Sequence, residues 1–278
     1  MIIDFHTHLL PLSFGQRREA IAAKDQTFAA LFADPRAKMV GKDELLSAMS
    51  DDGVDIAVAL GYGWTDENVA RESNDYLLEA AASSHGRIIA FCSVDPSWGD
   101  AAVREVERCV AAGARGIGEL HPTTQVTKLA TDHELNGIMA LAAKEGLPVV
   151  IHGSEPVGHE YAGKGDTHPG ELLALATRFP DVRIVAAHWG GGLPFYAHIP
   201  EVREALANVY FDSAATPLLY DQGVFSTVAS AVGPDRMLFG SDFPLLRPKR
   251  VTELAIADLR PAHAAMFLGG NAQGLLSQ

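Results

Sequence analysis

The chain opens on Met1-Ile2-Ile3-Asp4-Phe5-His6-Thr7-His8, a short apolar run that stops at a pair of histidines. Runs of this kind recur along the whole sequence, and each is followed by a longer segment with the period of a helix. We predict strands at 2–5, 55–60, 87–94, 114–119, 147–151, 183–187, 208–212 and 236–239. Alternation of strands and helices indicates βαβ units and therefore a parallel sheet.

The number of these units indicates the fold class. We predict helices at 42–50, 68–84, 101–112, 132–145, 170–178, 193–207, 221–232 and 249–257. Eight strand–helix units in about 250 residues are the size of an α/β fold of the (β/α)8 or TIM-barrel type. A doubly wound open sheet is the alternative, but no Gly-x-Gly-x-x-Gly sequence follows the first strand. Since no break in composition divides the chain, we expect a single barrel domain over residues 1–278.

Composition excludes several classes of protein. Of the 278 residues, 47% are hydrophobic and 21% charged, which is enough apolar material for a large core. The net charge of −13 and the absence of Lys/Arg runs disfavour nucleic acid and anionic membranes as partners. The start of the chain does not read as a signal peptide, so we expect a cytoplasmic protein that acts on a small molecule. A homodimer is compatible with these features.

Two connections are longer than usual for this fold. Residues 9–41 form an insertion after the first strand, partly helical at 16–32, and residues 153–169 form a Gly- and Pro-rich loop after the fifth strand. Both would emerge on the carboxyl-terminal face of a barrel, where active sites lie. We therefore expect them to cover a substrate, with surface decoration as the alternative.

Histidines and carboxylates stand where the predicted strands end. They are His6, His8, Glu119, His152, His188 and Asp242. Gathering these titratable groups at one rim would be costly without a cation, because buried charged groups must be paired or must coordinate metal. Imidazole and carboxylate ligands suit Zn²⁺, with Mn²⁺ and Fe²⁺ as alternatives. Glu119 could bridge two cations; if it pairs instead with Arg115 or Lys164, one metal is expected.

Three segments carry a family resemblance. They are Ile3-Asp4-Phe5-His6-Thr7-His8, Ala187-His188-Trp189-Gly190-Gly191 and Leu238-Phe239-Gly240-Ser241-Asp242-Phe243-Pro244. Together they resemble the amidohydrolase superfamily, and within it the amidohydrolase-2 branch that includes aminocarboxymuconate-semialdehyde decarboxylase. The resemblance covers essentially the whole chain and implies a metal-binding barrel.

The resemblance also implies roles for individual residues. It assigns His6, His8, His152 and Asp242 to the metal, and makes His188 either a ligand of a second metal or a catalytic acid/base. Many two-metal members carry a carboxylated lysine after the fourth strand. Here that position is Glu119, as in the metal-dependent deoxyribonuclease branch, so no carboxylation is needed.

We weigh two enzymatic functions. The main hypothesis is a metal-dependent hydrolase of a small ester, amide or lactone, in which Asp242 is the general base for a metal-activated water. The alternative is a single-metal, non-oxidative decarboxylase of a small unsaturated or aromatic acid, with His188 as acid/base. A non-catalytic binding barrel would leave Asp242 without a role.

Loop residues are candidates for substrate contact. Lys164 and Arg247 could bind a substrate carboxylate. Trp189 is expected in the apolar wall of the pocket, and His159 is expected to touch substrate. The glycines that follow Trp189 would open a helix. Asp4 shares the strand face of His6 and could support it, with a buried hydrogen bond to a neighbouring strand as the alternative.

Overall fold

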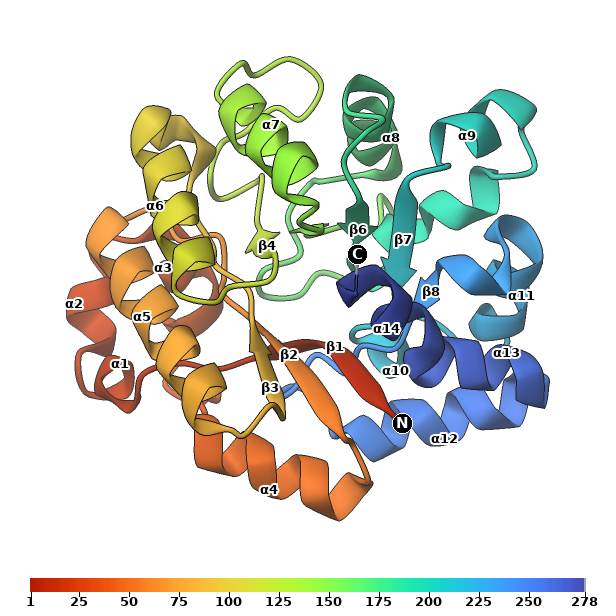
Figure 1. Cartoon of the computed structure of the whole chain (residues 1–278), viewed down its shortest axis with the longest axis horizontal. Helices are drawn as coiled ribbons and strands as arrows, with labels where there is room; N and C mark the ends of the chain where they lie inside the picture. The colour runs from red at the N-terminus through yellow and green to blue at the C-terminus, as the bar shows by residue number, and fades with distance from the viewer. Residues whose placement is uncertain (278) are drawn as a thin grey trace.

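The computed structural model describes residues 1–277, and in it parallel strands form a ring enclosed by helices (Figure 1). The strands are β1 (Ile3–His8), β2 (Ile56–Leu60), β3 (Ile88–Ala90), β4 (Ile117–Leu120), β5 (Val149–Ile151), β6 (Ile184–Ala186), β7 (Val209–Asp212) and β8 (Met237–Leu238). Every predicted strand is present, most of them shorter than predicted. The α/β barrel class expected from the sequence is confirmed.

Backbone hydrogen bonds close the ring at two seams. Strands β1–β3 form one parallel sheet and β4–β8 another. The first seam, between β3 and β4, is joined where the Gly118 N–H donates to the Cys92 carbonyl at 2.7 Å. At the second, the Phe5 N–H donates to the Phe239 carbonyl at 2.7 Å, and the His8 N–H to the Phe243 carbonyl at 2.8 Å. All strands therefore point the same way, and their carboxyl ends share one rim.

Helices cover the outside of the ring close to the positions that the sequence predicts (Figure 1). They are α4 (Lys42–Asp52), α5 (Glu67–Ser83), α6 (Asp100–Ala111), α7 (Leu135–Glu145), α8 (Pro169–Arg178), α11 (Val224–Val232) and α12 (Pro248–Asp258). Shorter elements are the 3-10 turns η1 (Pro96–Trp98) and η3 (Pro234–Arg236), α10 (Thr216–Leu219), α13 (Pro261–Ala265), the π-helical turn η4 (Met266–Gly270) and α14 (Asn271–Leu276).

One predicted helix, at 193–207, is wrong. The segment contains the 3-10 element η2 (His188–Tyr196) and the short α9 (Pro200–Ala205). The backbone from Trp189 to Gly192 is left-handed, with φ between 54° and 94°, so the glycines form a tight turn and open no helix. At Gly191, where φ is +61°, a Cβ would collide with the backbone carbonyl of Ser154. Glycine is needed there both for the conformation and for the close approach.

The interior of the ring is apolar below the rim. Ile3, Phe5, Phe91 and Val150 belong to one buried cluster, which also includes Leu275 of α14. Since α14 lies at the amino-terminal end of the strands, this end of the barrel is filled. The carboxyl-terminal rim is therefore the end at which a ligand can approach the interior.

The insertion after β1 has a core of its own. It contains α1 (Leu12–Gln16), α2 (Arg18–Ala22) and α3 (Gln26–Phe32). Phe14, Phe28 and Phe32 pack with Trp64, which follows β2 and is fully buried. This aromatic cluster fixes the insertion beside the carboxyl-terminal rim.

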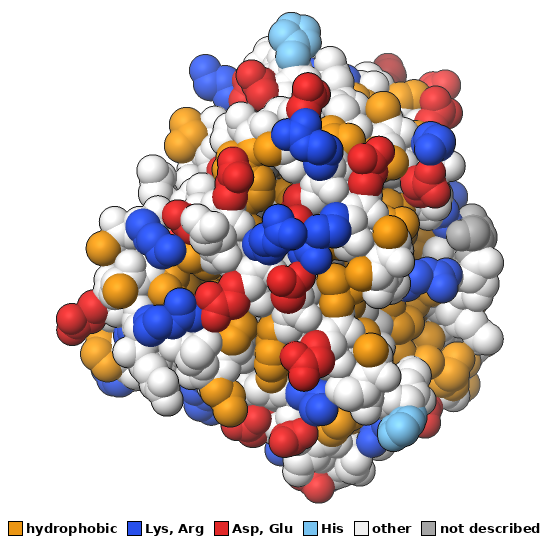
Figure 2. All heavy atoms as spheres, turned by 60° about the vertical axis from the view of Figure 1, so that its left-hand side comes forward, with side chains coloured by type: hydrophobic (Ala, Val, Ile, Leu, Met, Phe, Trp, Pro, Cys, Tyr) orange, Lys and Arg blue, Asp and Glu red, His pale blue; other side chains and the backbone are white. Residues whose placement is uncertain are grey.

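The surface carries no continuous basic field on the face that Figure 2 presents, where acidic and basic side chains alternate among scattered hydrophobic ones. No helix within residues 1–277 is long and apolar enough to cross a membrane.

Candidate metal centre

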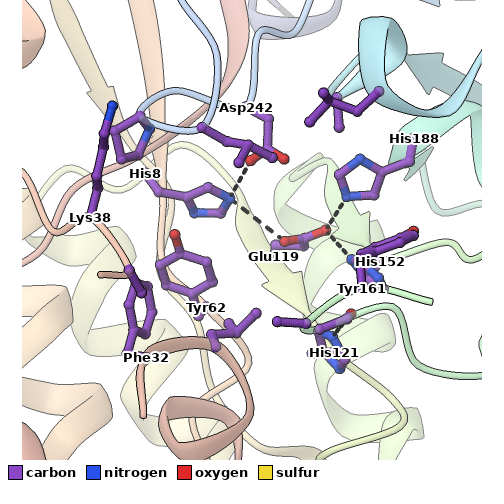
Figure 3. Close-up of a pocket in the computed structure, with 18 of the residues that line it drawn as sticks. His8, Phe32, Lys38, Tyr62, Glu119, His121, His152, Tyr161, His188 and Asp242 are labelled. Atoms are coloured by element: carbon purple, nitrogen blue, oxygen red, sulfur yellow. Dashed lines mark hydrogen bonds and ion pairs between the residues drawn. The ribbon is translucent and has the colours of Figure 1, made fainter. Parts of the chain in front are cut away.

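The strand-end histidines and carboxylates meet at the carboxyl-terminal rim (Figure 3). Two groups have ligand atoms within 4.8 Å of one another: His6, His8 and Glu119 form the first, and Glu119, His152 and His188 form the second. All five residues are buried. Asp242 faces the same cluster, with its side chain 15% exposed toward the pocket. The structure thus brings together all six residues singled out as ligands.

Glu119 lies between two pairs of imidazoles. Its Oε1 is 3.0 Å from His152 Nδ1 and 3.5 Å from His188 Nε2. Its Oε2 is 3.8 Å from His6 Nε2 and 3.7 Å from His8 Nε2. Because each oxygen faces a different pair, this carboxylate has the arrangement of a bridging ligand.

The sequence left open a pairing of Glu119 with Arg115 or Lys164, and within residues 1–277 neither side chain makes it. Arg115 donates to the backbone carbonyl of Leu276, and the Lys164 ammonium contacts Glu160 at 3.0 Å. Glu119 is surrounded by imidazoles instead.

Hydrogen bonds fix which nitrogen of three imidazoles is free. His8 Nδ1, His188 Nδ1 and His152 Nε2 each contact a backbone carbonyl, at 3.3, 3.1 and 3.0 Å. A carbonyl only accepts, so each of these nitrogens donates its N–H. In the neutral ring the other nitrogen then carries a lone pair, and in all three residues it faces the carboxylate cluster.

His6 follows the same rule through a carboxylate. Its Nδ1 lies 2.8 Å from Asp212 Oδ2, and both side chains are completely buried. Its Nε2 is consequently the free nitrogen, and it lies only 3.0 Å from His8 Nε2. Two lone pairs at this distance repel each other unless a proton or a cation lies between them. The donor set therefore fits a divalent metal ion bound by imidazole and carboxylate.

The pKa values of the cluster are shifted in the direction that favours positive charge at the imidazoles. Burial alone lowers the pKa of His6, but the nearby Asp212 and Glu119 carboxylates outweigh it and raise that pKa to about 9. His188 is likewise raised, to a pKa of about 10, by its hydrogen bond to Glu119 against the effect of burial. Despite burial, the facing imidazoles hold the pKa of Glu119 well below its usual value. The site therefore attracts positive charge.

A cavity of about 490 Å³ opens directly over this centre. Its walls include Leu31 and Phe32 from the insertion and His159 and Tyr161 from the loop after β5. Both long connections therefore reach the pocket. Tyr62 also lines it and stacks on His8, with ring centroids 4.0 Å apart.

The family follows from the whole chain. The amidohydrolase family model (Amidohydro_2) matches residues 3–277. The chain belongs to the amidohydrolase family. It is thus a metal-dependent enzyme of this family with a buried histidine and glutamate metal site. No curated protein sequence matches it significantly.

Solved structures of other proteins share this amidohydrolase's fold. 5-Carboxyvanillate decarboxylase from Sphingomonas paucimobilis is 16% identical, covers 99% of this chain and 98% of its own, and has a TM-score of 0.76. 2,6-Dihydroxybenzoate decarboxylase from Rhizobium is 17% identical, with coverage of 99% and 98% and a TM-score of 0.74. 5-Carboxyvanillate decarboxylase from Novosphingobium aromaticivorans, solved with manganese and 4-hydroxy-3-methoxy-5-nitrobenzoic acid, is 17% identical, with coverage of 100% and 96% and a TM-score of 0.78. At such identities the likeness establishes the fold.

Of the loop residues expected to contact substrate, only His159 lines the amidohydrolase pocket. Trp189 is fully buried beneath it, because the left-handed turn directs its indole inward to donate to Thr216 Oγ1 at 2.8 Å. Arg247 forms an ion pair with Asp52 at 2.7 Å, which holds its guanidinium on the outer surface. The Lys164 ammonium donates hydrogen bonds to the Glu160 carboxylate and to the His159 backbone carbonyl.

Sequence reasoning missed Asp212, although a signal existed. It ends β7 just as Glu119 lies at the end of β4, and it orients His6 while accepting the His188 N–H at 3.0 Å. Asp4 makes a buried hydrogen bond to the neighbouring β8 end of the barrel, since its Oδ1 accepts the backbone N–H of Ser241 at 2.9 Å. That bond anchors the segment leading to Asp242.

Backbone strain accompanies the site. Asp242 and His188 have φ of 63° and 56°, a left-handed conformation that residues other than glycine rarely adopt. Such strain persists only where surrounding contacts enforce it, and it concentrates at functional sites.

Proposed function

We propose that this protein is a metal-dependent, non-oxidative decarboxylase of a small aromatic or unsaturated acid. The observation that carries the proposal is a cation-binding centre that opens into a largely apolar cavity, whose wall among residues 1–277 carries no acidic side chain beyond the centre itself. Apart from Glu119 and Asp242 at the centre itself, the charged residues that line the pocket are basic, namely Arg36 and Lys38. An acid with a flat apolar body suits these surroundings.

The similar structures point in the same direction. Three of them are decarboxylases of aromatic acids, and one of these holds manganese together with a substituted benzoic acid. We therefore favour decarboxylation over the hydrolysis that was our main hypothesis from the sequence. Manganese is the first cation to test, with zinc, expected from the donor set, beside it.

The reaction needs a proton at the carbon that loses CO₂. A bound divalent cation would hold the oxygen atoms of the acid and stabilise the negative charge that develops. The bond between the ring carbon and the carboxylate breaks, its electron pair stays on the ring carbon, and a proton takes the place of CO₂. We assign the proton transfer to His188, which lines the pocket and whose Nδ1–H is held by the Ala214 carbonyl, leaving Nε2 to carry the proton.

Hydrolysis is the second candidate, and one observation favours it. Glu119 presents one oxygen to each pair of imidazoles, the geometry that would hold two cations about 3.5–4 Å apart. A two-metal centre with Asp242 as general base would act on a small ester, amide or lactone.

The experiment compares products and metal content. Protein loaded with Mn²⁺ is incubated with hydroxybenzoic and methoxybenzoic acids carrying ¹³C at the carboxylate, and labelled CO₂ is measured. We expect CO₂ release from at least one acid, its loss in His188→Asn, and one retained metal per chain in that variant. Absence of CO₂ from the whole panel, with turnover of esters or lactones at two metals per chain, would instead support hydrolysis.

A further inference from the structure

His121 is a buried histidine beside the metal centre that belongs neither to the six clustered residues nor to the proposed proton transfer. It stands two positions after Glu119, at the end of β4, and is only 3% exposed. Its ring lies flat against that of His152, with centroids 4.3 Å apart and an angle of 17° between the planes. Figure 3 shows it next to His152 at the margin of the cluster. The contacts of His121 therefore act on the metal centre through His152.

The two stacked imidazoles bind two consecutive carbonyls of the loop after β5. His121 Nε2 lies 2.9 Å from the Gly163 carbonyl, and His152 Nε2 lies 3.0 Å from the Lys164 carbonyl. A carbonyl only accepts, so both nitrogens donate. Because the two carbonyls belong to adjacent peptide groups, the bond from His121 helps to fix the carbonyl that His152 uses.

The Lys164 carbonyl determines which nitrogen of His152 can bind a metal ion. While this carbonyl accepts from Nε2, the neutral ring keeps its lone pair on Nδ1, which lies 3.0 Å from Glu119 Oε1. If the carbonyl moved away, the ring could turn or exchange its proton, and the lone pair would no longer face the cluster. The loop is thus part of the support of a metal ligand.

The local backbone and the neighbouring insertion suit this arrangement. Gly163 has a left-handed φ of 83°, and a Cβ there would collide with the side chain of Leu31 in α3. On the other edge of the ring, His121 Nδ1 lies 3.2 Å from Thr124 Oγ1, which in turn contacts the Thr27 hydroxyl of α3. His121 therefore lies where the end of β4, the loop after β5 and the insertion meet.

We propose that His121 is a positioning residue of the metal centre: it binds the loop after β5 so that the Lys164 carbonyl holds His152 in the form that can ligate. It acts through His152 and is not itself a ligand. Coupling of this kind is reciprocal, so bound metal must hold the loop closed to the same extent that the closed loop strengthens metal binding. The inference rests on the metal centre and not on the reaction, so it applies to a decarboxylase and to a hydrolase alike.

Two substitutions separate the hydrogen bond from the stacking. His121→Phe keeps a ring against His152 but has no donor for the Gly163 carbonyl, whereas His121→Gln has an amide that can donate to it. We expect His121→Phe to raise the Kd for Mn²⁺ about tenfold, the lower end of the range for groups that support a ligand, since the Ser154 hydroxyl still donates to the Lys164 carbonyl. His121→Gln should restore most of the affinity. The matched control is His133→Phe, the same change at an exposed histidine before α7, which should leave the Kd unchanged.

Proteolysis measures the reciprocal effect and needs no variant. Trypsin cleaves after lysine, and the Lys164 side chain is only 7% exposed, so cleavage after Lys164 requires this part of the loop to open. Saturating Mn²⁺ should slow that cleavage about tenfold, the same factor as in the affinity. Cleavage after Lys144, at the exposed end of α7, should change little. In His121→Phe the protection of Lys164 by Mn²⁺ should largely disappear.

Three results would each overturn the inference: an unchanged Kd in His121→Phe, an equal loss of affinity in His121→Phe and His121→Gln, or cleavage after Lys164 that does not respond to Mn²⁺ in the unmodified protein. A role of His121 in folding alone would lower the free energy of unfolding in His121→Phe and leave both the Kd and the protection by Mn²⁺ unchanged. Absence of CO₂ release from a protein whose Kd depends on His121 would count against decarboxylation and support the inference.

Discussion

Replacement of Asp212 by Asn tests how the metal ligands are oriented. The change keeps the volume of the side chain and leaves Oδ1 to accept the N–H groups of His188 and Ala214, both at 3.0 Å. It replaces Oδ2, however, with an amide nitrogen that donates. In the native protein Oδ2 lies 2.8 Å from His6 Nδ1. Facing an amide N–H donor at that place, His6 Nδ1 can only accept, so the proton of the His6 ring moves to Nε2.

The magnitude follows from that single exchange. A proton on Nε2 removes the lone pair that faces His8 Nε2 at 3.0 Å, so His6 is lost as a ligand unless it breaks its contact with residue 212. Loss of such a supporting carboxylate typically weakens metal binding about 10- to 100-fold, or about 1.4 to 2.7 kcal/mol. Protein freed of metal by chelation and titrated with Mn²⁺ against a fluorescent chelator gives the dissociation constant directly. Asp235→Asn, at a side chain 59% exposed, is the control. An unchanged constant in Asp212→Asn would refute the reasoning.

Three further outcomes are expected. Loading the metal-free protein with one Mn²⁺ per chain at pH 7 should release about one proton, because His6, with a pKa of about 9, must deprotonate to bind, whereas His188, with a pKa of about 10, keeps its proton for catalysis. Metal affinity should therefore rise from pH 7 to pH 9, and calorimetry in buffers of different ionisation enthalpy that detects no released proton would contradict this. Gly240→Ala should lower both stability and metal affinity, because the added Cβ would lie 2.7 Å from the Cβ of His6. Gly274→Ala on α14 is the control: its added Cβ would meet no atom within 4 Å, so the free energy of unfolding should rise by about 0.5–1 kcal/mol in denaturant unfolding. Trp189→Phe should lower stability by about 1–2 kcal/mol, because Thr216 loses the hydrogen bond from the indole, and KM should stay unchanged. A raised KM would show instead that Trp189 contacts the substrate.

The barrel was readable from sequence because its signal is local. A strand covered on both faces is a continuous apolar run, as at Val149–Ile151, and the polar residue that ends it marks the rim. Glu119 and His152 could therefore be placed together although 33 positions separate them. Because the strands are parallel, all their carboxyl ends lie at the same face of the barrel, which brings these residues together.

What could not be read depends on contacts between distant segments. Arg247 is drawn outward by Asp52, almost two hundred positions away, and no local pattern announces that pairing. Trp189 turns inward because consecutive residues adopt left-handed backbone angles, which a glycine run permits but does not require. Lys38 lies at the pocket wall because Arg18, far away in sequence, stabilises the turn that precedes it.

The metal centre is tested most directly by anomalous diffraction from crystals of the protein loaded with Mn²⁺, recorded at the manganese absorption edge. A strong peak is expected beside Glu119, between its carboxylate and the imidazoles of His6 and His8, with a second peak toward His152 and His188 if two cations bind. Well-ordered crystals with the barrel intact and no anomalous peak at this rim would contradict it.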